Sequence, residues 1–301
     1  MRWALVFSGQ GLQRPGMLPW LADDSTMQAL ATRCGADWRE RLADPSLAGD
    51  NVRAQVLLTA TACAAWAQLQ PLLPAPPDVV LGYSVGELAA FSAAGVFSAH
   101  TAVALAAERA AFMDQAAAGI DTGLLGITGA EAGGIAQLCR SFDLEVAIRI
   151  NEGAGLVGGQ RADLLSAAAE ATRRGWRCTP LNIAVASHTR WMLPAAEAFD
   201  RHLAGVVMQA PHAVLFSHAL GRIRNAQSAR TALSQQLAQT VRWDEAMDAM
   251  AAQGVQVVLE IGPGQALARM WQERDPRHIA RSVDEFKSAS AIAAWLARQV
   301  D

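Results

Sequence analysis

The chain has 301 residues, of which 52% are hydrophobic and 18% are charged, and its formal charge is −3 with an isoelectric point near 6.1. This size allows one large domain, or a domain with a second one inserted into it. The sequence contains no run of Lys and Arg residues that could neutralise phosphates, which argues against nucleic-acid binding. No segment approaches the ~20 apolar residues of a membrane span. The four separated cysteines show no metal-ligand spacing and are typical of small buried residues in a reducing compartment. We therefore expect a soluble, cytoplasmic protein with no membrane, nucleic-acid or metal partner.

Residues 3–7 form an apolar run that ends at a glycine-rich segment, which predicts a buried strand. An Ala- and Leu-rich stretch, 52–69, is typical of a helix, and the prolines of 74–77 end it before a second apolar run at 78–81. A third apolar run, 255–260, also leads into glycines and then a helical stretch. Strand, glycine turn and helix thus recur three times. The recurrence predicts an α/β protein with a large α/β-hydrolase-like core and a parallel sheet, whose active edge lies at the carboxyl ends of the strands.

The middle of the chain has a different pattern. Between residues 123 and 185 the expected elements follow the order strand, helix, strand, strand, helix, strand, which is the order of the ferredoxin-like unit. We expect residues 1–121 and 187–301 to form the large core and residues 122–186 to form an inserted ferredoxin-like subdomain. A cleft should form where the two meet.

Residues 82–86 read Gly-Tyr-Ser-Val-Gly and lie between the second strand and a helix that begins at Glu87. A strand that stops and a helix that begins at once force a sharp turn, whose apex presents Ser84 to open space. The helix directs its positive N-terminus and free N–H groups at the same place. The pattern predicts a nucleophilic serine beside an oxyanion site, with a serine that only caps the helix as the alternative.

A serine nucleophile needs a base, and His188 is the best placed of six histidines. It follows the last strand of the predicted insertion, at the return to the core and on the rim of the cleft. Arg109 is a lone guanidinium, apart from its neighbour Glu108, in the apolar helix expected over 101–118. A buried arginine would bind a carboxylate or phosphate with its planar fork. The alternatives are a surface or core role for His188, and a salt bridge within the helix or a solvated side chain for Arg109.

Several motifs, in order and over almost the whole chain, resemble those of malonyl-CoA:acyl-carrier-protein transacylases and the related acyltransferase domains of polyketide synthases. Any one of them is weak, but the set is specific. They are FSGQGLQRPGM at 7–17, GYSVGE at 82–87, RAAFM at 109–113, SH at 187–188 followed by Met192 and Pro194, QL at 236–237 before VRW at 241–243, and EIGPG at 260–264.

The resemblance implies a ping-pong acyl transfer. Ser84 would attack the malonyl thioester of coenzyme A with His188 as general base. The backbone N–H groups of Gln10 and Val85 would bind the oxyanion, and the main-chain carbonyl of Gln236 would orient the histidine.

The same resemblance implies that Arg109 binds the free carboxylate of the malonyl group. An acyl carrier protein would then take the acyl group on its phosphopantetheine-type thiol. No bound metal or redox cofactor is implied. Malonyl-CoA is the substrate, and coenzyme A and the carrier protein are the partners.

Some positions depart from the family pattern. Tyr83 stands where the family usually has histidine, and His218 stands where it commonly has asparagine. His218 would either line the cleft or be exposed, and we expect it to be exposed. The segment 185–188, Val-Ala-Ser-His, leaves malonyl and methylmalonyl preference open. The GYSVGE motif and the compact length most resemble the epsilon subunit of bacterial malonate decarboxylase. That subunit loads malonyl onto a small carrier subunit with a phosphoribosyl-dephospho-CoA thiol.

Three other interpretations remain open at this point. The first is a stand-alone fatty-acid or trans-acting polyketide malonyl-CoA acyltransferase. The second is an α/β-hydrolase esterase that shares G-x-S-x-G, although the sequence has no His-Gly-Gly-Gly segment and Arg109 would have no role there. The third is a docking subunit that keeps the fold without catalysis.

Overall fold

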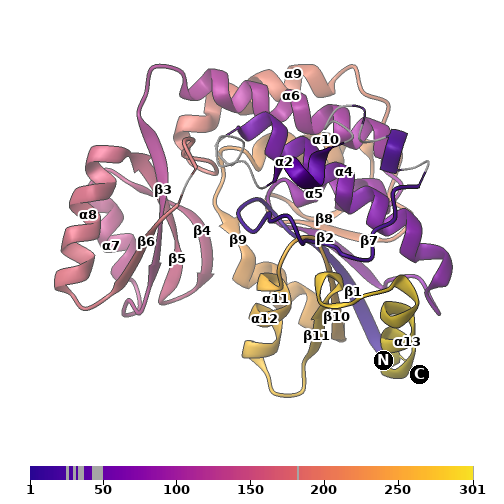
Figure 1. Ribbon diagram of the computed structural model, residues 1–301. Coiled ribbons are helices and arrows are strands. Elements are labelled where there is room, and N and C mark those ends of the chain that lie inside the picture. Colours follow the sequence, from indigo (N-terminus) through magenta and orange to yellow (C-terminus); the bar gives the residue numbers. More distant parts are fainter. Residues whose placement is uncertain (25–26, 30–31, 33–36, 43–49, 182, 301) are drawn as a thin grey trace.

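The computed structural model describes residues 1–24, 27–29, 32, 37–42, 50–181 and 183–300. These residues form two β-sheets with helices packed against them (Figure 1). The α/β class expected from the sequence is confirmed. Within the described part of the chain, no helix is both long and apolar enough to cross a bilayer. Cys63 and Cys139 are buried free thiols, Cys178 is half-buried, and Cys34 lies outside the described residues.

The larger sheet has six strands in the order β11-β10-β1-β2-β7-β8. Neighbouring strands are parallel from β11 to β7, as expected, and only the edge strand β8 runs antiparallel. Its strands are β1 (Arg2–Phe7), β2 (Val79–Gly82), β7 (Val214–Ser217), β8 (Gly221–Ile223), β10 (Val255–Ile261) and β11 (Ile279–Ser282).

Alternate side chains of β1 enter two different cores. Trp3, Leu5 and Phe7 pack on one face of the sheet, and Ala4 and Val6 pack on the other. Because both faces are covered, the strand is apolar almost throughout. The helices that bury residues on the first face are α4 (Asn51–Leu69), α5 (Gly86–Ala93), α6 (Ala99–Ala117), α9 (Leu193–Leu203), α10 (Ala226–Gln235) and α13 (Ala289–Val300). The second face is covered by α11 (Trp243–Ala252) and α12 (Ala266–Arg274).

The smaller sheet has five strands in the order β6-β3-β5-β4-β9 and forms the left-hand lobe of Figure 1. The elements follow the predicted order, with α7 (Gly134–Ser141) and α8 (Arg161–Arg173) between the strands. The fifth strand, β9, comes from outside residues 122–186 and pairs parallel to β4. The predicted domain boundaries stay a prediction. The strands are β3 (Thr122–Thr128), β4 (Glu145–Asn151), β5 (Ala154–Gln160), β6 (Arg177–Pro180) and β9 (Val241–Arg242).

Two expectations about local structure are wrong. The last strand of the middle region ends at Pro180 rather than at residue 185, although the Leu181 N–H still donates to the Leu124 carbonyl at 3.1 Å. No helix follows β1 directly: residues 8–24 contain none, so strand, glycine turn and helix recur twice rather than three times. The remaining short elements are α2 (Trp38–Arg41), η1 (Gln70–Leu72), η2 (Arg190–Met192) and η3 (Val283–Glu285).

Candidate active site

The turn between β2 and α5 has the sharp shape that the sequence predicts. β2 ends at Gly82, α5 begins at Gly86, and Ser84 between them has a left-handed φ of 55°. A Cβ at Gly82 would lie 2.2 Å from the Glu87 nitrogen, and one at Gly86 would lie 2.4 Å from the Phe7 carbonyl oxygen. Only glycine fits either position. A serine held in the left-handed region costs on the order of 1–3 kcal/mol, a strain that proteins keep chiefly at functional sites.

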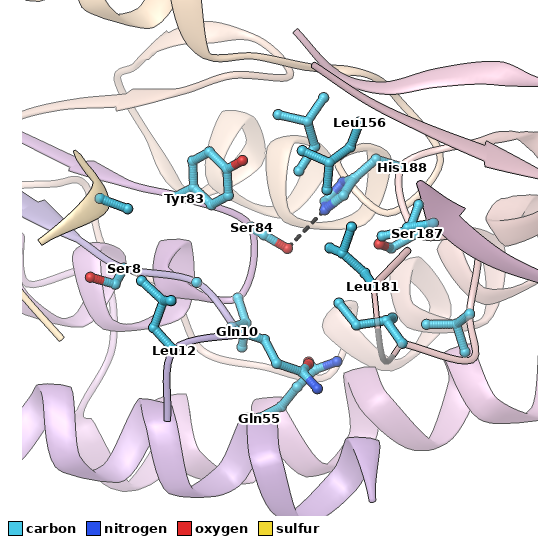
Figure 2. A pocket seen from close by; sticks show the side chains of 18 of the residues that line it. Ser8, Gln10, Leu12, Gln55, Tyr83, Ser84, Leu156, Leu181, Ser187 and His188 are labelled. Atoms are coloured by element: carbon cyan, nitrogen blue, oxygen red, sulfur yellow. Dashed lines mark hydrogen bonds between the residues drawn. The ribbon is translucent and has the colours of Figure 1, made fainter. Parts of the chain in front are cut away.

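The His188 imidazole points toward Ser84 (Figure 2), and its other nitrogen faces Gln236 at the end of α10. Its Nε2 is 2.8 Å from the Ser84 Oγ, and its Nδ1 is 2.7 Å from the Gln236 carbonyl oxygen. Because a carbonyl only accepts, Nδ1 carries the proton and Nε2 is free to accept the one from the serine hydroxyl. The His188 N–H also donates to the Leu237 carbonyl at 2.8 Å. These two contacts at the end of a helix fix the ring in the orientation that activates a serine.

Burial and neighbouring charge keep this imidazole neutral. His188 is 1% exposed, and desolvation lowers its pKa well below the ordinary value of 6.5. His218 and Arg109 lower the pKa further, and the Gln236 carbonyl opposes them. The ring is therefore in the form of a general base at neutral pH.

Arg109 extends from α6 toward the same serine and is 1% exposed. Its Nη1 donates to the Gln55 side-chain oxygen at 2.5 Å, and its Nη2 donates to the Gln236 side-chain oxygen at 3.2 Å and to the Ser84 Oγ at 3.4 Å. These partners, and the Met113 sulfur at 3.3 Å, are all neutral. Within the described residues Arg109 forms no ion pair, so both alternatives, a helix salt bridge and a solvated side chain, are wrong.

The guanidinium keeps its charge in spite of this burial. Desolvation lowers the pKa of Arg109 to about 10, and the nearby Glu87 carboxylate partly opposes that shift. At neutral pH the group is a buried cation with neutral hydrogen-bond partners. Such a group can bind a carboxylate through two parallel hydrogen bonds.

The two predicted oxyanion donors line the same cavity as Ser84. Val85 is the N-cap of α5, and Gln10 follows β1 on a loop that faces the serine (Figure 2). Neither backbone N–H donates to an acceptor among the residues that the structure describes. The loop is braced by Ser8, whose Oγ donates to the buried Glu260 carboxylate at 2.6 Å. The site thus offers two fixed, unused N–H donors beside the nucleophile.

A cavity of about 340 Å³ surrounds these groups and lies where the sequence predicts a cleft. Ser84 from the turn after β2, Arg109 from α6 and His188 from the segment between β6 and η2 form the polar side. The smaller sheet supplies apolar side chains, among them Leu124 and Leu156. The volume suits a small ligand or the slender arm of a larger one.

Three residues at the site were not predicted from the sequence. Gln55 and Glu87 are buried in α4 and α5, at 1% and 0% exposure. His218 was expected to be exposed, and this is wrong: its side chain is 0% exposed and its Nδ1 lies 3.0 Å from the Glu87 Oε1. A polar side chain within an apolar helical run was the available signal for Gln55 and Glu87.

The geometry defines an α/β enzyme in which a strained serine hydroxyl meets a neutral imidazole and a buried cation. The acyl transferase domain family matches residues 4–295. The malonyl CoA-acyl carrier protein transacylase of Mycobacterium tuberculosis is 33% identical over 280 residues, which cover 88% of this chain and 90% of the relative.

Solved structures agree with this match. The crystal structure of the MCAT from Mycobacterium tuberculosis is 30% identical, with a TM-score of 0.88, and the match covers 97% of this chain and all of the other. A malonyl-transacylase in complex with a type II PKS acyl-carrier protein is 27% identical, with a TM-score of 0.90, covering 97% of this chain and 99% of the other. The chain belongs to the acyl transferase domain family, and the enzyme is an acyltransferase.

Proposed function

We propose that this enzyme transfers a malonyl group from malonyl-CoA to the thiol of an acyl carrier protein, through an ester on Ser84. The observation that carries the proposal is the position of the Ser84 Oγ, 2.8 Å from the His188 Nε2 and 3.4 Å from the Arg109 Nη2. A nucleophile and a carboxylate-binding cation are thus close enough for one three-carbon acyl group to contact both.

The first half-reaction forms the ester. The Ser84 Oγ attacks the thioester carbonyl, and its proton passes to the His188 Nε2. The tetrahedral oxyanion accepts hydrogen bonds from the N–H groups of Gln10 and Val85, and the Gln236 carbonyl stabilises the imidazolium. The carbon–sulfur bond then breaks, and the proton on His188 passes to the departing coenzyme A sulfur. The second half-reaction is the reverse, with the carrier thiol as nucleophile.

The choice of acyl group depends on Arg109 in this proposal. A malonyl carboxylate would accept from the two Arg109 Nη groups in place of the Met113 sulfur and the Ser84 Oγ. The side chains of Gln55 and Gln236 would hold the guanidinium in place. An acetyl group has no carboxylate, and it would leave the cation with neutral partners alone.

The acceptor is best supported as an acyl carrier protein of fatty-acid or polyketide type. The relative from Mycobacterium tuberculosis is named as a malonyl CoA-acyl carrier protein transacylase, and a related enzyme was solved with a type II PKS carrier. The malonate decarboxylase epsilon subunit is the second candidate. It rests on the GYSVGE motif, in which Tyr83 precedes the serine, and on the compact length of the chain.

We also infer that residues 122–186 are an inserted ferredoxin-like subdomain on an α/β-hydrolase-like core. The strand order β6-β3-β5-β4 and the antiparallel pairing of these strands support this assignment. In this arrangement the insertion provides the apolar wall of the cavity and covers the ester on Ser84.

Incubation with malonyl-CoA, with and without a carrier protein, tests the proposed function. Without an acceptor we expect release of one coenzyme A per enzyme, followed by slow turnover. With a phosphopantetheinylated acyl carrier protein we expect many turnovers. Sustained release of malonate without an acceptor would identify a hydrolase, and no release of coenzyme A at all would identify a docking protein. Turnover only with a carrier bearing the phosphoribosyl-dephospho-CoA group would favour the malonate decarboxylase context.

The burial of His188 predicts how the rate of Ser84 acylation depends on pH. Its lowered pKa keeps the imidazole neutral as the pH falls through 6.5, where an exposed histidine would be protonated. We expect the rate of Ser84 acylation to stay constant from neutral pH down through 6.5 and to fall only at lower pH. Stopped-flow detection of coenzyme A release against pH measures this. A loss of rate centred at 6.5 would contradict the described environment of His188.

A further inference from the structure

The side chains of Glu87 and His218 form a buried pair directly behind the site. Both are 0% exposed, and the His218 Nδ1 lies 3.0 Å from the Glu87 Oε1. The same oxygen accepts a hydrogen bond from the His218 backbone N–H at 3.2 Å. Glu87 belongs to the first turn of α5, three residues after Ser84, and His218 follows β7. A carboxylate and an imidazole removed from water in this way are rarely placed without a role.

The pair is in contact with the base. The rings of His188 and His218 have centroids 5.8 Å apart and planes at 79°, so one ring presents its edge to the face of the other. The Nδ1 contact with Glu87 is short, but its angle does not make it a hydrogen bond, and within the described residues neither ring nitrogen of His218 has a hydrogen-bond partner. The ring of His218 is therefore held by packing next to Glu87 and lies against the ring of His188.

We propose that His218, held by Glu87, is a positioning residue for His188 that fixes the plane of its ring and keeps it from taking up a second proton. This inference rests on the proposed function, in which His188 is the general base. Among the residues that the structure describes, no other residue of the site packs a ring against the ring of His188.

The charges around His188 give the direction of the effect. His218 faces it from the segment after β7, Arg109 from α6, and the Gln236 carbonyl from the end of α10. His218 and Arg109 both lower the pKa of His188, and the Gln236 carbonyl raises it. Glu87 opposes the lowering of the Arg109 pKa, and its Oε1 lies 3.0 Å from the His218 Nδ1. Replacement of His218 is therefore expected to make His188 easier to protonate.

Two substitutions of His218 separate the effect of its ring packing on His188 from its electrostatic effect. His218→Phe keeps a ring against His188 but has no charge, and His218→Asn removes both. We expect the acidic limb of the acylation rate to move to higher pH by about one unit in both variants, because His218 no longer lowers the pKa of His188. At pH values below this limb, the acylation rate of each variant would be about tenfold lower than that of the wild type. His218→Asn should also lower the acylation rate at neutral pH, since the ring of His188 loses its support, whereas His218→Phe should not.

The controls address folding and the base itself. His100→Asn, on the exposed N-terminal turn of α6, should leave the pH profile unchanged. Thermal unfolding of each variant checks that it is folded. NMR titration of the His188 ring nitrogens measures its protonation without any need for activity, and we expect a higher midpoint in both His218 variants.

The outcomes test the proposed function and the role of His218 separately. If the wild type forms no ester on Ser84, the proposed function fails, while the NMR titration still decides the role of His218. If the wild type forms the ester and the folded His218 variants keep both its pH profile and its His188 midpoint, the inference about His218 is wrong. A shift in His218→Asn alone would assign the effect to packing and would overturn the electrostatic part.

Discussion

Replacement of Ser84 by alanine is expected to lower malonyl transfer by about 10⁴-fold or more, the loss seen when a serine nucleophile is removed from an intact base and oxyanion site. The hydroxyl is the group that the turn between β2 and α5 holds at a strained φ of 55°, 2.8 Å from His188. Alanine at this position keeps the turn but has no oxygen to form the ester. Coenzyme A release and carrier loading, measured together, should both be lost.

A matched serine elsewhere serves as the control. Ser141→Ala, at the exposed end of α7, removes a hydroxyl that only donates to the Gln137 carbonyl of the same helix. We expect wild-type transfer from this variant. Transfer by Ser84→Ala at more than a few per cent of the wild-type rate would mean that the carrier thiol attacks malonyl-CoA directly, without an enzyme ester.

Replacement of Arg109 by alanine is expected to cause the second large effect, a loss of selectivity for malonyl-CoA over acetyl-CoA. A buried guanidinium that pairs with a ligand carboxylate is worth about 10²- to 10³-fold when one partner is removed. We expect kcat/KM for malonyl-CoA to fall by about that factor, and kcat/KM for acetyl-CoA to change little or to rise. The ratio of malonyl-CoA to acetyl-CoA kcat/KM, measured by competition in one reaction, should therefore fall by at least the same factor.

Arg109→Lys tests the geometry of this contact. Lysine keeps the charge but loses the planar fork, so it cannot donate to Gln55, to Gln236 and to a carboxylate in the same arrangement. We expect malonyl selectivity between those of the wild type and of Arg109→Ala. An unchanged ratio of malonyl to acetyl transfer in folded Arg109→Ala would remove the carboxylate contact from the mechanism.

The parts of the site that the sequence predicts are those with a strong local pattern. Ser84 follows from one strand, two glycines and one helix within about ten residues, and the structure shows each of them. The positions of His188 and Arg109 were expected from the insertion and from an apolar helix, and both side chains do reach Ser84. Gln10 and Val85 line the same cavity.

The rest depends on contacts between distant segments. His218 is buried because β7 pairs with β2, and neither the strand of four residues nor its partner could be inferred from spacing. Gln55 meets Arg109 because α4 packs along α6, so its role is set by tertiary packing and not by its own helix. In the same way β9 joins the smaller sheet from a segment well after it in sequence.

The central claim is that Ser84 carries the malonyl group between two thiols. Intact-mass measurement of the wild-type protein after malonyl-CoA should show one added malonyl group, located on Ser84 by fragmentation. Addition of a phosphopantetheinylated carrier protein should then move this mass to the carrier and restore the mass of the free enzyme. A wild-type protein that takes up no malonyl group, or that carries one elsewhere than on Ser84, would contradict the account.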